Sequence, residues 1–159
     1  MSYESFSPQS RVWIYQSERP FTEIEKDEIN RQVATFAKQW TAHNHQLKAW
    51  GGIVEDNILV LMVDETQAGA SGCSIDTSVH FVQEMQNHYK TDFFNRLLVT
   101  YQDNSNWKTA SIDEVESAYQ SGAVSEDTLV INTLVQTKAE MEQNFRIPLK
   151  ETWIAQRLN

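Results

Sequence analysis

The sequence is poor in residues that mark several classes of protein. Its 159 residues include one cysteine, five glycines and three prolines. A single cysteine cannot form an internal disulfide, which suits a reducing compartment, and the scarcity of glycine and proline argues against collagen-like repeats and long disordered linkers. The longest apolar run, at residues 58–63, is far shorter than the about 20 residues that cross a membrane. No apolar stretch typical of a signal peptide opens the chain, so we expect a cytoplasmic protein.

Positive charge is also scarce. Lysine and arginine number 13 against 22 acidic residues, which gives a formal net charge of −9, and no run of basic residues occurs. Nucleic acids and anionic membranes carry negative charge and are bound by basic surfaces. The composition therefore predicts binding neither to nucleic acids nor to membranes.

Apolar and aromatic residues, by contrast, are plentiful, at 40% and 11% of the chain. A chain of this length buries about 70% of its unfolded surface. The whole chain has the length of a single domain of ordinary size. We expect one domain over residues 1–159, with a core at 11–102 and an extension at 103–159 that packs on it. The extension is too short to be expected to hold a full core of its own.

The first part of the chain predicts two strands that flank a helix, followed by a third strand. Residues 12–15 are β-branched and aromatic, as is typical of a strand. Thr22 begins a capping box, and a stripe of apolar residues at helical spacing follows it. Residues 47–54 and 58–63 predict a hairpin around a short acidic turn. The second hairpin strand is apolar throughout, which predicts burial on both faces at the centre of a sheet.

A helix over residues 77–89 and a strand over 97–101 complete a split βαβ order. This order predicts an α+β, ferredoxin-like fold, in which a four-stranded antiparallel sheet carries both helices on one face. The remainder predicts a C-terminal α/β extension. Capping boxes that begin at Ser111 and Thr137 indicate two helices, and residues 127–132 indicate a strand between them.

The only cysteine lies in a loop of small residues between the predicted central strand and the second helix. A helix N-terminus stabilises a thiolate, so Cys73 is a candidate nucleophile with Asp76 as a second catalytic candidate. Gly72, Cys73 and Ser74 together are a candidate ligand- or anion-binding turn. The alternative is a packed strand-to-helix corner with cysteine as a small buried residue, and the carboxylate of Asp76 opposes thiolate formation. Ser74 or Asp76 is the expected N-cap.

Other polar residues show no strong pattern for a site. His43 and His45 could bind a metal only if the fold brought them to Cys73, and zinc sites usually have denser ligand spacing. We therefore predict no metal and no cofactor. The carboxylates of Asp64 and Glu65 follow the central strand, where two acids can divide acid and base roles but more often serve turns.

Five tryptophans are more than a small core needs. Some are therefore expected to line a groove or a subunit interface, where aromatic residues are enriched. Trp50 is the best surface candidate, because the neighbouring Gly51 and Gly52 are expected to leave that strand poorly covered.

Three stretches carry a resemblance to a known family: residues 12–16 (VWIYQ), residues 70–76 (ASGCSID) and the segment from Pro148 to Trp153. The chain is similar, over most of its length, to short uncharacterised bacterial proteins that are often labelled ABC transporter ATPases. The resemblance implies a small bacterial protein and supplies no catalytic residues. The sequence does not support the ATPase label, because the glycine-rich Walker A motif with its lysine is missing.

Two hypotheses of function follow. The first is a non-enzymatic interaction or regulatory protein, expected to form a homodimer through an exposed sheet edge or an uncovered sheet face. The second is a small thiol-dependent or anion- or ligand-binding enzyme that uses the loop at Gly72, Cys73 and Ser74.

Overall fold

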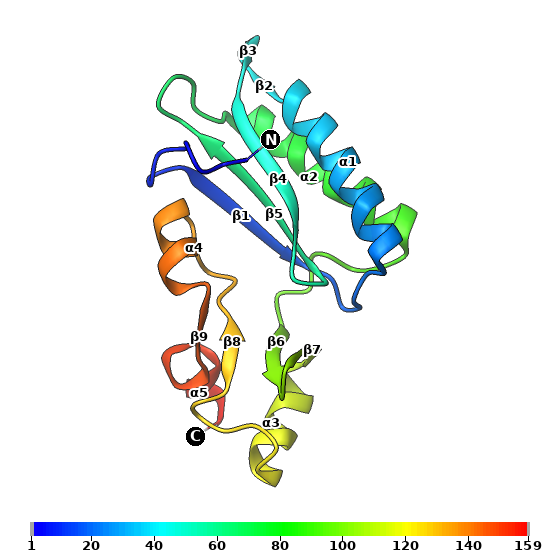
Figure 1. The fold of residues 1–159 in the computed structure, drawn as a ribbon, viewed down its shortest axis with the longest axis vertical. Helices are drawn as coiled ribbons and strands as arrows, with labels where there is room; N and C mark the ends of the chain where they lie inside the picture. Colours follow the sequence, from blue (N-terminus) through cyan, green and yellow to red (C-terminus); the bar gives the residue numbers. More distant parts are fainter. Residues whose placement is uncertain (1, 159) are drawn as a thin grey trace.

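The predicted α+β class is confirmed by a computed structural model, which describes residues 2–158. Its first sheet contains three antiparallel strands in the order β1–β5–β4 (Figure 1). These strands are β1 (Arg11–Gln16), β4 (Lys48–Val54) and β5 (Ile58–Asp64). Every residue of β5 is buried, so the predicted central position of this strand is confirmed.

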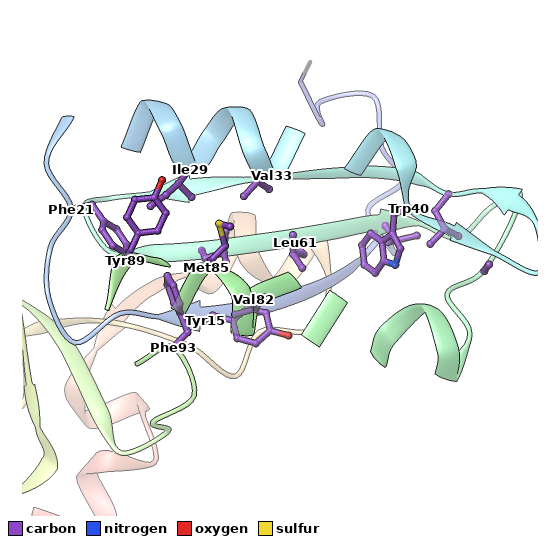
Figure 2. Close-up of a cluster of buried hydrophobic side chains, with 14 residues drawn as sticks. Tyr15, Phe21, Ile29, Val33, Trp40, Leu61, Val82, Met85, Tyr89 and Phe93 are labelled. Atoms are coloured by element: carbon purple, nitrogen blue, oxygen red, sulfur yellow. The ribbon is translucent and has the colours of Figure 1, made fainter. Parts of the chain in front are cut away.

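Two long helices, α1 (Glu23–Gln39) and α2 (Gly72–Tyr89), cover one face of this sheet (Figure 1). The predicted capping box of α1 is present, with Thr22 accepting a hydrogen bond from the amide of Glu25. Alternate residues of β5 point to this face, where they meet apolar side chains of both helices (Figure 2). The shared cluster includes Tyr15, Phe21, Ile29, Val33, Trp40, Leu61, Val82, Met85, Tyr89 and Phe93. A small hairpin of β2 (Thr41–Ala42) and β3 (His45–Gln46) follows α1.

The opposite face of the first sheet is also covered, by segments from the two ends of the chain. The other set of β5 residues packs there against Phe6 and against helix α4 (Lys138–Asn144) with its flanking residues. The buried members of this cluster are Phe6, Val12, Ile58, Val60, Met62, Ile131, Val135, Met141 and Phe145. Burial on both faces explains why β5 is apolar at every position except its last.

A second antiparallel sheet lies beside the first, in the order β7–β6–β8–β9. Its strands are β6 (Leu98–Asp103), β7 (Asn106–Ser111), β8 (Leu129–Ile131) and β9 (Arg146–Pro148). Helices α3 (Ile112–Ser121) and α5 (Ile154–Leu158) and the 3₁₀ turn η1 (Leu149–Glu151) accompany it. This part has an apolar cluster of its own, formed by Val99, Tyr101, Ala110, Ile112, Val115, Val124, Val130, Leu149 and Ile154. Residues 103–158 therefore contribute both to a cover for the first sheet and to a second core.

The ferredoxin-like sheet of four strands is not found, because the expected fourth strand belongs to the second sheet. Residues 98–103 pair along their whole length with residues 106–111, a strand that the sequence analysis did not predict. The turn between them is short, and Asn104 adopts the left-handed conformation that such turns need. The free edge of β1 instead receives the chain near residue 136, where the amide of Val12 donates to the carbonyl of Gln136. Strand β6, which the split βαβ order would have placed beside β1, thus pairs in a local hairpin with β7.

Buried polar side chains join the two sheets. Gln16 at the end of β1 donates to the carbonyl of Leu98 at 2.8 Å and accepts from the hydroxyl of Thr100 at 2.9 Å. Asn57, in the turn between β4 and β5, donates to Thr109 at 2.8 Å and to the carbonyl of Ser17 at 3.0 Å. Because buried polar groups are costly when unpaired, this network favours one relative placement of the two sheets.

Within residues 2–158, no helix is both long and apolar enough to span a lipid bilayer.

Candidate functional site

The loop that contains Cys73 differs from its sequence-based prediction. Helix α2 begins at Gly72, and its N-cap is Ser71 instead of the expected Ser74 or Asp76. Ser71 accepts a hydrogen bond from the amide of Ser74, and the hydroxyl of Ser74 accepts one from the amide of Ser71 at 2.7 Å. Cys73 is therefore in the first turn of the helix, and its side chain is exposed. The alternative of a packed corner with a buried sulfur is wrong.

The candidate residues of this loop cap and begin helix α2 and do not converge on a site. Ser74 is buried, and its carbonyl accepts the indole N–H of Trp40 at 2.8 Å. Asp76 is exposed, and a Cβ placed at Gly72 would meet no atom within 4 Å. Among residues 2–158, no hydrogen bond or ion pair joins the side chain of Cys73 or of Asp76 to another side chain. The geometry adds no base and no orienting group to the proposed nucleophile.

The two carboxylates at the end of β5, of Asp64 and Glu65, have separate structural roles. Asp64 is 2% exposed, and its oxygens accept from the amide of Ser7 at 2.9 Å and the hydroxyl of Thr66 at 2.7 Å. Burial alone would raise the pKa of Asp64, but these hydrogen bonds and the nearby ammonium of Lys48 outweigh it and hold the pKa below its usual range. Glu65 instead accepts from the amide of Ala70 at 2.8 Å. Asp64 therefore anchors the N-terminal segment, and the two acids do not form a catalytic pair.

The histidines and the other described ligand-type residues do not converge. His43 and His45 lie in the exposed β2–β3 hairpin. Among residues 2–158, no group of three or more His, Cys, Asp or Glu side chains is placed to hold a metal ion.

The glycines beside Trp50 have the opposite effect from the one expected. A Cβ at Gly51 would collide with Val33 of α1 and would lie 2.9 Å from Leu61, so the glycine lets the helix pack closely on β4. Trp50 itself points to the other face of the sheet, where its ring packs 4.6 Å from that of Tyr3. The glycines therefore do not leave the helix-facing side of this strand uncovered, but Trp50 is half-buried and lines a cavity, as expected of the best surface candidate among the tryptophans.

An apolar groove that the sequence analysis did not identify lies where the two sheets meet. Four large apolar side chains of residues 2–158 are exposed: Ile24, Phe94, Leu97 and Leu134. The last three line one cavity of about 260 Å³ together with the half-buried Trp153. We call this surface the junction groove, and its lining comprises Ile14, Tyr15, Gln16, Phe93, Phe94, Asn95, Arg96, Leu97, Thr133, Leu134 and Trp153.

Four separate segments build the junction groove, and the one between η1 and α5 supplies the half-buried Trp153. Strand β1 supplies Tyr15, whose ring meets that of Phe94 edge-to-face at 5.6 Å. The connection from α2 to β6 supplies Phe94, Arg96 and Leu97, and the connection after β8 supplies Leu134. Because the polar network around Gln16 fixes the start of β6 to β1, the connection that leads into β6 keeps its position beside β1.

The electrostatics of the junction groove are simple. Arg96 is the only charged residue in its lining, and no ion pair engages it within residues 2–158. Burial raises the pKa of the Tyr15 phenol, while the charge of Arg96 lowers it to a smaller extent. The groove therefore offers apolar walls, a neutral phenol and one free guanidinium.

The sequence contained a signal for this groove. In the stretch FFNRLL at residues 93–98, large apolar residues flank an Asn-Arg pair that interrupts any helix or strand pattern. Leu97 was expected inside a strand, but the strand starts at Leu98 and leaves the side chain of Leu97 55% exposed. An apolar cluster in a connection between elements is an unusual place for core residues, and it could have been noticed.

Comparisons of this chain with protein-family models, with curated proteins and with solved structures give no match.

Proposed function

We propose that this protein is a non-enzymatic interaction protein that binds an apolar segment of another protein in the junction groove. The observation that carries the proposal is that Phe94, Leu97 and Leu134 gather on one groove, although most large apolar side chains of residues 2–158 are buried. Contiguous exposed apolar surface is uncommon on soluble chains and marks sites of interaction.

The size of the groove favours a side chain over a metabolite. Its volume of about 260 Å³ is below the range of about 300–1,000 Å³ that is usual for small-molecule sites. Protein interfaces commonly place one large anchor side chain in a pocket of this kind, surrounded by weaker contacts. We therefore expect the bound segment to insert one aromatic or branched aliphatic residue.

The positive charge of Arg96 in the junction groove favours an acidic residue next to the anchor residue of the bound segment. The Arg96 guanidinium has planar donor groups that match a carboxylate, and no acid of residues 2–158 pairs with it. A partner segment with aspartate or glutamate beside its apolar anchor satisfies both features of the groove.

Selection of peptides from a random display library against the purified protein tests this function. Selection is expected to enrich peptides that carry a large apolar residue with an acidic neighbour. Enrichment of sequences without an apolar anchor would contradict the proposal, as would peptides that bind Leu97→Asp and wild-type protein equally well.

The sequence predicts a homodimer through a sheet edge or an uncovered sheet face, and a second copy is the alternative occupant of this groove. Sedimentation velocity over a wide range of protein concentration separates the two. A monomer at every concentration agrees with a groove that is open to another protein. A dimer that Leu134→Asp abolishes would assign the groove to a second copy and contradict a different partner.

A further inference from the structure

A second feature, on the opposite side of the first sheet, lies outside the proposed function. Strand β4 is an edge strand, and among the described residues it pairs only with β5. Edge strands present unpaired backbone groups that another strand can use, and proteins usually cover or block them.

The two ends of this edge are blocked. The amide of Ile53 donates to the side chain of Asn30 on α1 at 2.8 Å. The amide of Leu47, just before the strand, donates to the carbonyl of Trp40 at 2.9 Å. Both amides therefore point away from β5.

The middle of the edge is open. Because successive residues of a strand direct their backbone groups to opposite sides, Ala49 and Gly51 point the same way as Leu47 and Ile53. Their amides find no hydrogen-bond partner among residues 2–158. The outward backbone groups of Ala49 and Gly51 are therefore available to pair with an added strand.

A groove runs along this open part of the edge. Its volume is about 640 Å³, and its lining includes Ala49 and Gly51 of the strand together with Ala34 and Lys38 of α1. The N-terminal segment forms another wall with Phe6. We call this surface the edge groove.

The wall made by the N-terminal segment is held firmly by buried charges. The carboxylate of Asp64 accepts from the amide of Ser7 at 2.9 Å. The ammonium of Lys138, which is also buried, donates to the carbonyls of Glu4 and Phe6 at 2.9 and 2.8 Å. The edge groove is therefore a built surface, with a wall fixed on each side of the strand.

The charge in the edge groove is opposite to that of the whole chain. Although the chain has 22 acidic residues and a net charge of −9, the lining of this groove contains two lysines and no carboxylate. The ammonium of Lys48 lies 3.4 Å from Asp64, whereas Lys38 makes no ion pair within residues 2–158. This lysine is free to attract a negative group.

We propose that the edge groove binds an extended, acidic segment of a partner protein, which adds to β4 as a further strand at Ala49 and Gly51. The open amides require an extended backbone, because only a strand places its carbonyls at the matching spacing. Lys38 selects an acidic side chain in that segment, and the apolar walls accept the side chains that alternate with it.

A peptide that alternates valine and glutamate is the probe for this site. Its affinity is measured by fluorescence anisotropy, with a peptide that alternates valine and lysine as the charge control. The protein is expected to bind the first peptide and not the second. Equal binding of the two peptides, or no binding of either, would overturn the proposal.

Substitutions separate the backbone contribution from the charge contribution. Ala49→Pro removes an outward amide without removing a bond to β5, and is expected to abolish binding. Lys38→Glu is expected to weaken binding by about tenfold, while Lys108→Glu, an exposed lysine of the second sheet, leaves it unchanged. If Ala49→Pro does not fold, the lysine pair alone decides the outcome. Equal effects of the two lysine substitutions would contradict the site.

Amide hydrogen exchange identifies the strand that binds. The amides of Ala49 and Gly51 are expected to exchange fast in the free protein and to become protected when the valine–glutamate peptide is added. Protection that depends on protein concentration without peptide would show pairing with a second copy and overturn the proposal. The Leu97→Asp variant should bind this peptide normally, so failure at the edge groove is distinguishable from failure at the junction groove.

Discussion

At position 51 the backbone lies so close to α1 that a side chain has no room. Alanine there would collide with Val33 and approach Leu61 to 2.9 Å. We expect Gly51→Ala to destabilise the fold by about 1–3 kcal/mol, which is typical of overpacked sites. Gly72→Ala is the matched control, because its Cβ meets nothing within 4 Å and alanine favours a helix. Urea unfolding of both variants tests this, and equal stability of the two would contradict the close packing of α1 on β4.

The buried carboxylate of Asp64 links stability to pH. Its pKa in the folded protein is lower than in the unfolded chain, so the stabilisation that it contributes is complete above the unfolded pKa, at about 3.9, and is lost as pH falls below that value. Asp64→Asn should cost about 2 kcal/mol at neutral pH, because charged hydrogen bonds to Ser7 and Thr66 are weakened. Urea unfolding as a function of pH is the measurement. The wild-type and variant curves are expected to converge toward acid, and curves that stay parallel below pH of about 4 would contradict this role.

The exposure of Cys73 allows a test of the hypothesis that the protein is a thiol-dependent enzyme. Because the thiol is at the surface, it should react with iodoacetamide in the native protein without unfolding. Alkylation of Cys73 should leave peptide binding at the junction groove unchanged, since Cys73 is not part of its lining. The measurement is the alkylation rate by mass spectrometry with and without urea. A thiol that reacts only after unfolding would contradict the observed position of Cys73.

At the scale of elements, the polar side chains between the two sheets decide how the parts fit. Asn57 is 4% exposed and donates to Thr109 and to the carbonyl of Ser17. Asn57→Ala should cost about 1–3 kcal/mol, because the partners are left buried without a donor. Thr35→Ala on the exposed face of α1 is a control that should change stability little. Thermal unfolding monitored by circular dichroism tests this, and a variant as stable as wild type would show that the junction does not depend on Asn57.

Elements with a strong local signal were predictable from the sequence. The capping boxes at Thr22 and Ser111 mark the starts of α1 and α3, and Gly122 ends α3 in the left-handed conformation that the residue suggests. The buried centre of the first sheet followed from the unbroken apolar run of β5. Each of these features depends on residues that are neighbours in the chain, so one sequence is enough to reveal them.

Features that depend on competition between distant segments were not predictable. The strand at residues 98–103 could pair with β1 or with residues 106–111, and no local pattern ranks the two choices. Strand β7 is mostly polar because much of it is exposed, so it resembled a loop. The start of α2 was placed too late because Ser71, Ser74 and Asp76 are all acceptable caps. The junction groove combines four segments that the folded second sheet brings together.

At the scale of the whole molecule, two surfaces of different character lie at opposite edges of the first sheet. The junction groove borders β1 and is mainly apolar with one free arginine, whereas the edge groove borders β4 and combines open backbone amides with two lysines. Among residues 2–158, neither lining contains a carboxylate, although the chain as a whole carries a net charge of −9. This arrangement suits a protein that holds segments of other chains. The strongest binding must come from local complementarity, since the overall negative charge repels acidic segments at long range.

The most direct test of this account is calorimetric titration of the best selected peptide into three proteins. These are wild type, Leu97→Asp, and Ile24→Asp, which alters the exposed apolar residue outside the junction groove. We expect Leu97→Asp to weaken binding by at least about thirtyfold, equivalent to about 2 kcal/mol, and Ile24→Asp to bind like wild type. Equal affinity for all three proteins, or a loss in Ile24→Asp that matches the loss in Leu97→Asp, would contradict the central claim that the junction groove is the binding surface.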